Sequence, residues 1–187
     1  RMLMAYLAVI AGGLDHPEHF YAREDIEWLI KVPSVGLSPA QRKALAKQCV
    51  QSPHLTPQLI DSIADECDGW RAKKLYERAD WLRSLTLYQN SPAEALRNTI
   101  SKLGIYRYFK STSSKDIQVN EKVATCEAFV SYVQGVRVSA TEVLEQLKAL
   151  SDSTEGQVNE HGLHLLSIHK AKGLEFDLVL LAGLQEG

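Results

Sequence analysis

The chain has 187 residues and a formal net charge of −2 at pH 7, with 45% hydrophobic and 24% charged residues. This composition is typical of a folded protein with an apolar core, and it excludes global disorder and a uniformly basic coat for nucleic acid. Every apolar run is shorter than the ~20 residues needed to cross a bilayer, so no membrane partner is expected.

The first third of the chain has the apolar spacing of helices. Met2–Ala11 is apolar almost throughout and predicts a buried helix, and Arg23–Lys31 carries a helical stripe. Ser38-Pro39 and Thr56-Pro57 each place a hydroxyl residue before a proline, which predicts an N-cap followed by the first helical position. The helix that starts at Ser38 is expected to run to about Val50.

Four further helices are expected between residues 70 and 150. Trp70–Tyr88 is the longest, and its predicted inner face comprises Leu75, Ala79, Leu82 and Leu85. Sequences of capping-box form start two others, at Ser91 and at Ser139. Gly104 and Gly135 are expected to end helices, and residues 111–114 are expected to form a polar loop.

The character of the sequence changes after residue 150. Residues 151–160, SDSTEGQVNE, are polar and indicate a linker. Two short apolar runs, Leu163–Ile168 and Phe176–Leu181, then predict buried strands. We therefore expect a mainly α fold, with a helical body at 1–150, a linker at 151–160 and a short two-stranded α/β tail at 161–187.

The polar turn between the two predicted strands is the strongest candidate for chemistry. Polar residues at the end of a buried strand are where α/β sheets bind ligands. Ser167 and His169 can donate hydrogen bonds to phosphates, and Glu175 can accept them from sugar hydroxyls. Gly173 lacks a Cβ, so the backbone can turn sharply there or another group can approach closely.

The stretch 167–176, SIHKAKGLEF, resembles motif V of the UvrD/Rep/PcrA family of superfamily 1 DNA helicases, T-x-H-x-A-K-G-L-E-F. The resemblance implies an enzyme that couples ATP hydrolysis, with magnesium, to 3′→5′ movement on single-stranded DNA. It also implies that the tail belongs to the second RecA-like (2A) domain. Ser167 and His169 would contact the single strand, while Gly173 and Glu175 would lie at the ATP.

Residues 2–160 have the length, helical content and position of the 2B subdomain, which in this family is inserted just before motif V. The resemblance implies that this part binds duplex DNA or regulates the enzyme. Residues 32–38, VPSVGLS, resemble the duplex-binding loop P-x-R-G-I-G, which makes Gly36 and Ser38 candidate DNA contacts. Val35 replaces the basic residue and Ser38 the second glycine, so a plain capped turn is the alternative.

Charge is unevenly distributed along the chain. Residues 69–115 contain ten basic and three acidic residues, whereas residues 119–187 contain five basic and ten acidic residues. The basic stretch, with Lys73 and Lys74, either binds phosphate backbone or forms a solvated helix face. This stretch also contains three aromatic residues, Trp70, Tyr76 and Trp81. We expect them to lie in the core or to be partly buried, and not to stack on bases.

Several absences limit the chemistry of the chain on its own. It contains no G-x-x-x-x-G-K-[ST] phosphate loop, so no catalytic residue is assigned and the isolated chain is expected to lack ATPase activity. The acidic run 65–68 is expected at a helix end, where it cannot serve as the magnesium motif of a buried strand. No metal site is expected. Three widely separated cysteines, Cys49, Cys67 and Cys126, indicate reduced thiols in a cytoplasmic protein.

The sequence therefore predicts a fragment of an ATP-dependent DNA helicase of the DNA-repair type, with both ends lying inside the longer protein. ATP and magnesium would act in that parent, and its partners would be duplex and single-stranded DNA. Two other interpretations stay open: a helical module that docks a repair or transcription protein, or an inactive helicase-like subunit of a repair complex.

Overall fold

The computed structural model describes residues 1–156, 171–172 and 175–180. The chain divides into two compact units, Arg1–Ser151 and Asp152–Gly187. Along the described residues the α-helices are, in chain order, α1 (Met2–Ile10), α2 (Trp28–Lys31), α3 (Pro39–Gln51), α4 (Thr56–Asp65), α5 (Gly69–Leu85), α6 (Pro92–Lys102), α7 (Ile105–Thr112), α8 (Asp116–Val136) and α9 (Ala140–Gly156). Short 3₁₀ helices lie at Pro17–His19, Arg23–Glu27, Pro53–Leu55 and Thr86–Tyr88. The mainly helical fold expected from the sequence is therefore confirmed.

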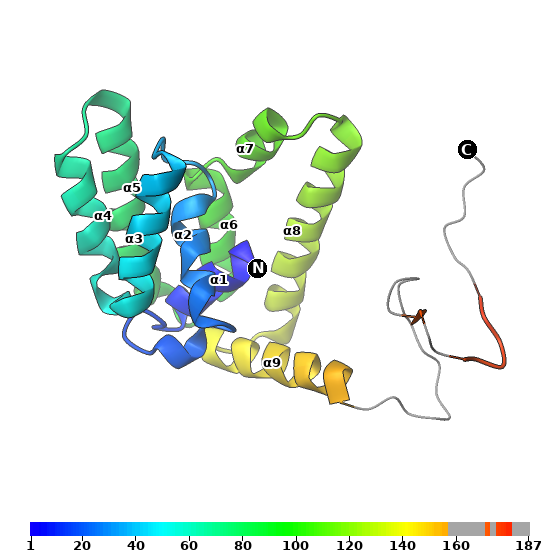
Figure 1. Cartoon of the computed structure of the whole chain (residues 1–187). Helices are drawn as coiled ribbons and strands as arrows, with labels where there is room; N and C mark the ends of the chain where they lie inside the picture. Colours follow the sequence, from blue (N-terminus) through cyan, green and yellow to red (C-terminus); the bar gives the residue numbers. More distant parts are fainter. Residues whose placement is uncertain (157–170, 173–174, 181–187) are drawn as a thin grey trace. The chain divides into compact units, whose positions relative to one another are not determined.

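In the first unit, α1 is the central helix. Figure 1 shows α3, α4 and α5 on one side of it and α8 on the other. Eight of the nine residues of α1 are buried, because α2, α5 and α6 pack against it. A helix that is apolar on every face is stable only when other elements cover every face, as they do here. The predicted buried helix at Met2–Ala11 is confirmed.

The inner face predicted for residues 70–88 is also confirmed. All four of its residues are buried in α5, namely Leu75, Ala79, Leu82 and Leu85. Trp81 is buried too, and its indole Nε1 donates a hydrogen bond of 3.0 Å to Thr99 Oγ1 of α6. The ammonium group of Lys102 lies 4.2 Å from the centre of the Trp81 ring. These contacts join α5 to α6.

Several predicted helix boundaries are confirmed by the local hydrogen bonds. Ser38 caps α3, and Ser139 forms the expected capping box with Glu142, whose carboxylate accepts from the Ser139 backbone N–H at 2.9 Å. Gly104, at φ 64°, follows the end of α6. That left-handed conformation suits glycine and lets the chain reverse from α6 into α7.

Other predicted caps and helix ends differ in the structure. α6 begins at Pro92, directly after Ser91 as predicted, but the Ser91 side chain makes no capping bond, because its ψ of 51° is far from the extended geometry that N-caps use. α8 runs through Gly135 and ends at Val136, since a single glycine costs a helix only ~1 kcal/mol. α7 continues to Thr112, into the predicted polar loop. α9 extends to Gly156, because the predicted linker has neither proline nor glycine before that residue.

The predicted strands are not confirmed. Within the run Phe176–Leu181, residues 176–180 are irregular and form no strand. A strand is held by hydrogen bonds to a neighbouring strand, and no strand is present among the described residues to provide them. The other run, Leu163–Ile168, lies outside the described residues. None of the helices in the described ranges is both long and apolar enough to span a membrane.

Candidate functional site

Residues 32–38 form the loop that connects α2 to α3, and a buried arginine of α5 holds this loop by hydrogen bonds. Arg78 projects from α5, is 3% exposed, and donates hydrogen bonds to the carbonyl oxygens of Leu29 and of Pro33, the latter at 3.0 Å. A buried guanidinium needs such partners, because an unpaired one would lose its hydration without compensation. The side chains of Val35 and Leu37 are buried, so the loop presents alternate residues to the solvent.

Gly36 lies directly against the first turn of α5. Its φ is +80°, and a Cβ atom placed on it would lie 2.6 Å from Trp70 Cη2 and 3.2 Å from Arg71 Cγ. The left-handed φ favours glycine here, and a Cβ would also require the Trp70 ring to shift. The structure therefore brings the predicted loop residue Gly36 next to Trp70 and Arg71, more than thirty residues further along the chain.

Trp70 does not belong to the core. Its side chain is 61% exposed, so the expectation that it is core or partly buried is wrong, while the same expectation is confirmed for Trp81. Trp70 lies in the first turn of α5, before the buried stripe of that helix begins, and its ring packs on a glycine instead of a side chain. The exposed fraction of Tyr76 is 39%, which lies between those of Trp81 and Trp70.

Ser38 is exposed, but its polar groups are engaged within α3. Its hydroxyl accepts a 3.3 Å hydrogen bond from the Gln41 backbone N–H, and the Gln41 side chain accepts a 3.0 Å bond from the Ser38 backbone N–H. The Gly36 N–H donates in turn to Ser34 Oγ at 3.3 Å. A phosphate at this helix start must displace the Gln41 side chain, since that amide occupies a donor the anion would use.

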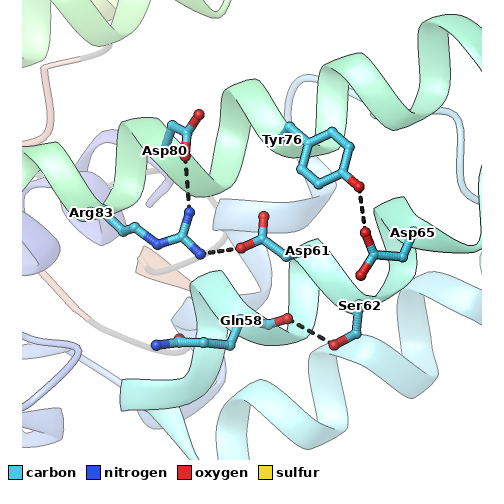
Figure 2. A network of polar contacts seen from close by, with 7 residues as sticks. All are labelled: Gln58, Asp61, Ser62, Asp65, Tyr76, Asp80 and Arg83. Carbon is cyan, nitrogen blue, oxygen red and sulfur yellow. Dashed lines mark hydrogen bonds and ion pairs between the residues drawn. The ribbon is translucent and has the colours of Figure 1, made fainter.

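The basic stretch at 69–115 does not form one continuous patch. Arg78 is buried, and Lys74 pairs with Glu77 at 3.3 Å. Arg83 donates to Asp80 at 2.9 Å and to Asp61 of α4 (Figure 2). Arg71 is therefore the exposed base next to Gly36, and Lys73 is exposed two residues further along α5; neither has an ion pair with any residue that the structure describes. The adjacent residues Lys73 and Lys74 therefore differ, since Lys74 has a carboxylate partner and Lys73 has none among the described residues.

The polar contacts of Figure 2 fix α4 against α5 on the solvent side. Tyr76 donates a hydrogen bond to Asp65, and this bond raises the pKa of the Tyr76 hydroxyl above its ordinary value. The hydrogen bond to Asp61 likewise raises the pKa of Arg83. Asp65, the first residue of the acidic run 65–68, thus ends α4 and accepts a hydrogen bond from α5. This position confirms the helix-end interpretation of that run.

The residues of the predicted motif in the tail are mostly outside the described part. Ser167, His169 and Gly173 lie outside it, and their predicted contacts with DNA and ATP stay predictions. Glu175 is described and exposed, so its carboxylate is accessible for a hydrogen bond from a hydroxyl group.

Sequence reasoning missed Trp70 and Arg71 as neighbours of the 32–38 loop. Helical periodicity reports which residues share a face of one helix, and it carries no information about contacts between a loop and a distant helix. Gly36 itself was the available signal, because a glycine inside an otherwise apolar loop often marks a close approach of another group.

Comparison with known proteins gives a consistent result. The family model of the UvrD-like helicase C-terminal domain matches residues 41–187. A curated relative from Bacillus subtilis (strain 168), named "Putative ATP-dependent DNA helicase YjcD", is 27% identical over 158 residues. That match covers 84% of this chain but only 18% of the relative. No solved structure gives a significant match.

Proposed function

The chain belongs to the family of UvrD-like helicase C-terminal domains, and from this premise we propose that it supplies the 2B subdomain and motif V of a longer DNA helicase. The parent would couple ATP hydrolysis to 3′→5′ movement on single-stranded DNA. The helical unit would contact duplex DNA through the 32–38 loop and the first turn of α5. Residues 167–175 would connect the single strand to the nucleotide.

The observation that carries the duplex contact is the packing of Gly36 against Trp70. It places the exposed residues of the loop next to an exposed aromatic ring on α5, the helix that also carries the exposed bases Arg71 and Lys73. Positive side chains that lack carboxylate partners can neutralise phosphates without first breaking an ion pair. The loop itself lacks the basic residue of the related motif, and Arg71 can supply that charge from α5.

ATP and magnesium belong to the proposed parent. Of the two residues that the resemblance would place at the nucleotide, Glu175 is the one that the structure describes, and its exposed carboxylate can accept a hydrogen bond from a ribose hydroxyl. The chain contains no phosphate loop, so we expect purified chain to show no magnesium-dependent ATP turnover.

The duplex contact can be tested by fluorescence anisotropy with a labelled hairpin duplex that carries a single-stranded 3′ tail. We expect weak binding whose affinity falls with salt, and a slope of log affinity against log salt that decreases by about 0.9 for each phosphate contact removed. Arg71→Gln and Lys73→Gln should each weaken binding. Arg83→Gln is the matched control, because it removes the same charge from the same helix at a group already paired with two carboxylates.

Equal losses in all three variants would show a general charge effect and contradict a contact at the loop. The second candidate function, docking of a repair or transcription protein, is favoured by the exposed Trp70, since exposed aromatic residues are typical of protein interfaces. Under that alternative, DNA binding is absent even at low ionic strength. Arg78 is unsuitable for charge reversal in either test, because its buried guanidinium holds the loop.

A further inference from the structure

A polar cleft lies between α6, α7 and α8, and none of the residues of the 32–38 loop lines it. Its volume is about 580 Å³, which is within the usual range of small-molecule sites. Ile100 and Val130 form an apolar floor, and they are buried. Polar side chains from all three helices surround that floor, namely Arg97, Ser101, Tyr106, Arg107, Glu127 and Ser131.

Two arginines line the cleft, Arg97 and Arg107, and neither forms an ion pair with a residue in the part of the chain that the structure describes, although the carboxylate of Glu127 lines the same cleft. Arg97 is held by a hydrogen bond to the amide oxygen of Gln134 on α8, which is a neutral partner. Arg107 has no ion pair within the ranges that the structure describes. Arg97 and Arg107 stand on different helices, and the left-handed turn at Gly104 brings those helices together. Two positive charges and one negative charge, that of Glu127, therefore line the cleft, and the excess positive charge favours a bound anion.

The remaining polar groups indicate what kind of anion fits. Burial raises the pKa of Tyr106, as do the charge of Glu127 and a hydrogen bond to its side chain, so the Tyr106 hydroxyl stays protonated and is engaged by Glu127, while Tyr106 contributes an aromatic ring to the cleft lining. Two hydroxyl groups, on Ser101 and Ser131, can also donate. Forked guanidinium donors with hydroxyl donors and an aromatic ring match a phosphate joined to a sugar and a base better than they match an isolated carboxylate.

We propose that the α6–α7–α8 cleft binds a phosphate group carried by a nucleotide unit, with Arg97 and Arg107 as its ligands. This site is separate from the 32–38 loop and does not depend on the duplex contact proposed there. The phosphate has two sources, a DNA strand or a free nucleotide. Glu127 also lines the cleft, and its negative charge opposes the binding of an anion there.

Amide NMR of the full chain tests this proposal, with dTMP, a ten-residue oligothymidylate and a glutamate-rich peptide as separate probes. We expect shifts at Gly104, Arg107 and Ser131 with a phosphate-bearing probe. A response to both nucleic-acid probes indicates a free-nucleotide site, and a response to the oligomer alone indicates a strand site. Either supports the proposal. Shifts with the peptide alone, or with none of the probes, overturn it.

Substitutions provide the second measurement. Arg97→Gln and Arg107→Gln should each weaken binding of the responding probe by about tenfold, the loss typical of one charged hydrogen bond. Glu127→Gln should strengthen it. Lys110→Gln is the matched control, because Lys110 is an exposed base of α7 that does not line the cleft. A loss in Lys110→Gln as large as that in Arg107→Gln would overturn the assignment, while circular dichroism checks that each variant is folded.

Discussion

Trp70 packs its exposed ring on the backbone of Gly36, so closely that a Cβ at residue 36 would lie 2.6 Å from Trp70 Cη2. This contact joins the α2–α3 loop to the start of α5. It places an aromatic ring and the base Arg71 beside residues 32–38, which contain no cationic side chain. The proposed duplex contact depends on that arrangement.

Gly36→Ala should therefore destabilise the helical unit by about 2–3 kcal/mol, because the left-handed φ and the contact with Trp70 both oppose a Cβ. Gly104→Ala is the control. Gly104 has a φ of +64°, and nothing lies within 4 Å of the position that a Cβ would take there, so only the conformational cost of about 1 kcal/mol applies. Urea unfolding of the double variant tests the contact. When Trp70 is already replaced by alanine, the loss of unfolding free energy caused by Gly36→Ala should fall towards the loss caused by Gly104→Ala. An unchanged loss would contradict the contact between Gly36 and Trp70.

Arg78→Met should destabilise the unit by about 2–4 kcal/mol. The substitution leaves the buried carbonyls of Leu29 and Pro33 without their donor, and each lost buried partner costs about 1–3 kcal/mol. Lys73→Met on the same helix is exposed and should stay within about 0.5 kcal/mol of the wild type. Chemical denaturation of both variants makes the comparison. Similar small losses in the two would show that Arg78 does not anchor the loop.

The cap at the start of α9 should make stability depend on pH. Hydrogen bonds from Ser139 lower the pKa of Glu142 below its ordinary value of 4.5. The folded form therefore binds this proton less readily than the unfolded chain. The stabilisation is present above about pH 4.5 and is lost as the pH falls through the lowered pKa.

Thermal melting of Glu142→Ala between pH 3 and pH 7 tests this. The variant should melt below the wild type at pH 7, and the difference should shrink as the pH falls and the wild-type carboxyl takes up a proton. Glu145→Ala, an exposed change on the same helix, should follow the wild-type pH profile. A difference for Glu142→Ala that stays constant across the range would exclude a charged cap.

The cysteines should differ in reactivity. Burial raises the pKa of the Cys49 thiol to about 11, so almost none of it is thiolate at pH 8. Cys126 is buried and its pKa is also raised, whereas Cys67 is partly exposed. In a disulfide-exchange assay on native chain, Cys67 should react first, and Cys67→Ser should remove the fast phase. A fast phase that persists in Cys67→Ser would show that the core opens rapidly.

The sequence by itself determined the helical class, the buried helix at the start of the chain, the inner face of α5 and the caps at Ser38 and Ser139. These features depend on residues within about four positions of one another, and such short-range patterns set helix faces and ends. The motif at 167–176 also identified the helicase family, which the family match over residues 41–187 supports.

Only the tertiary structure decided which charges are available. The ten basic residues spread over residues 69–115 look equivalent in sequence. In the structure, however, Arg78 is buried, Arg83 is paired with a carboxylate of another helix, and Arg97 and Arg107 line the same cleft. The exposure of Trp70 was decided in the same way. Whether a charged side chain is buried or paired with an opposite charge depends on residues that are distant in the chain. Local periodicity carries no information about those residues.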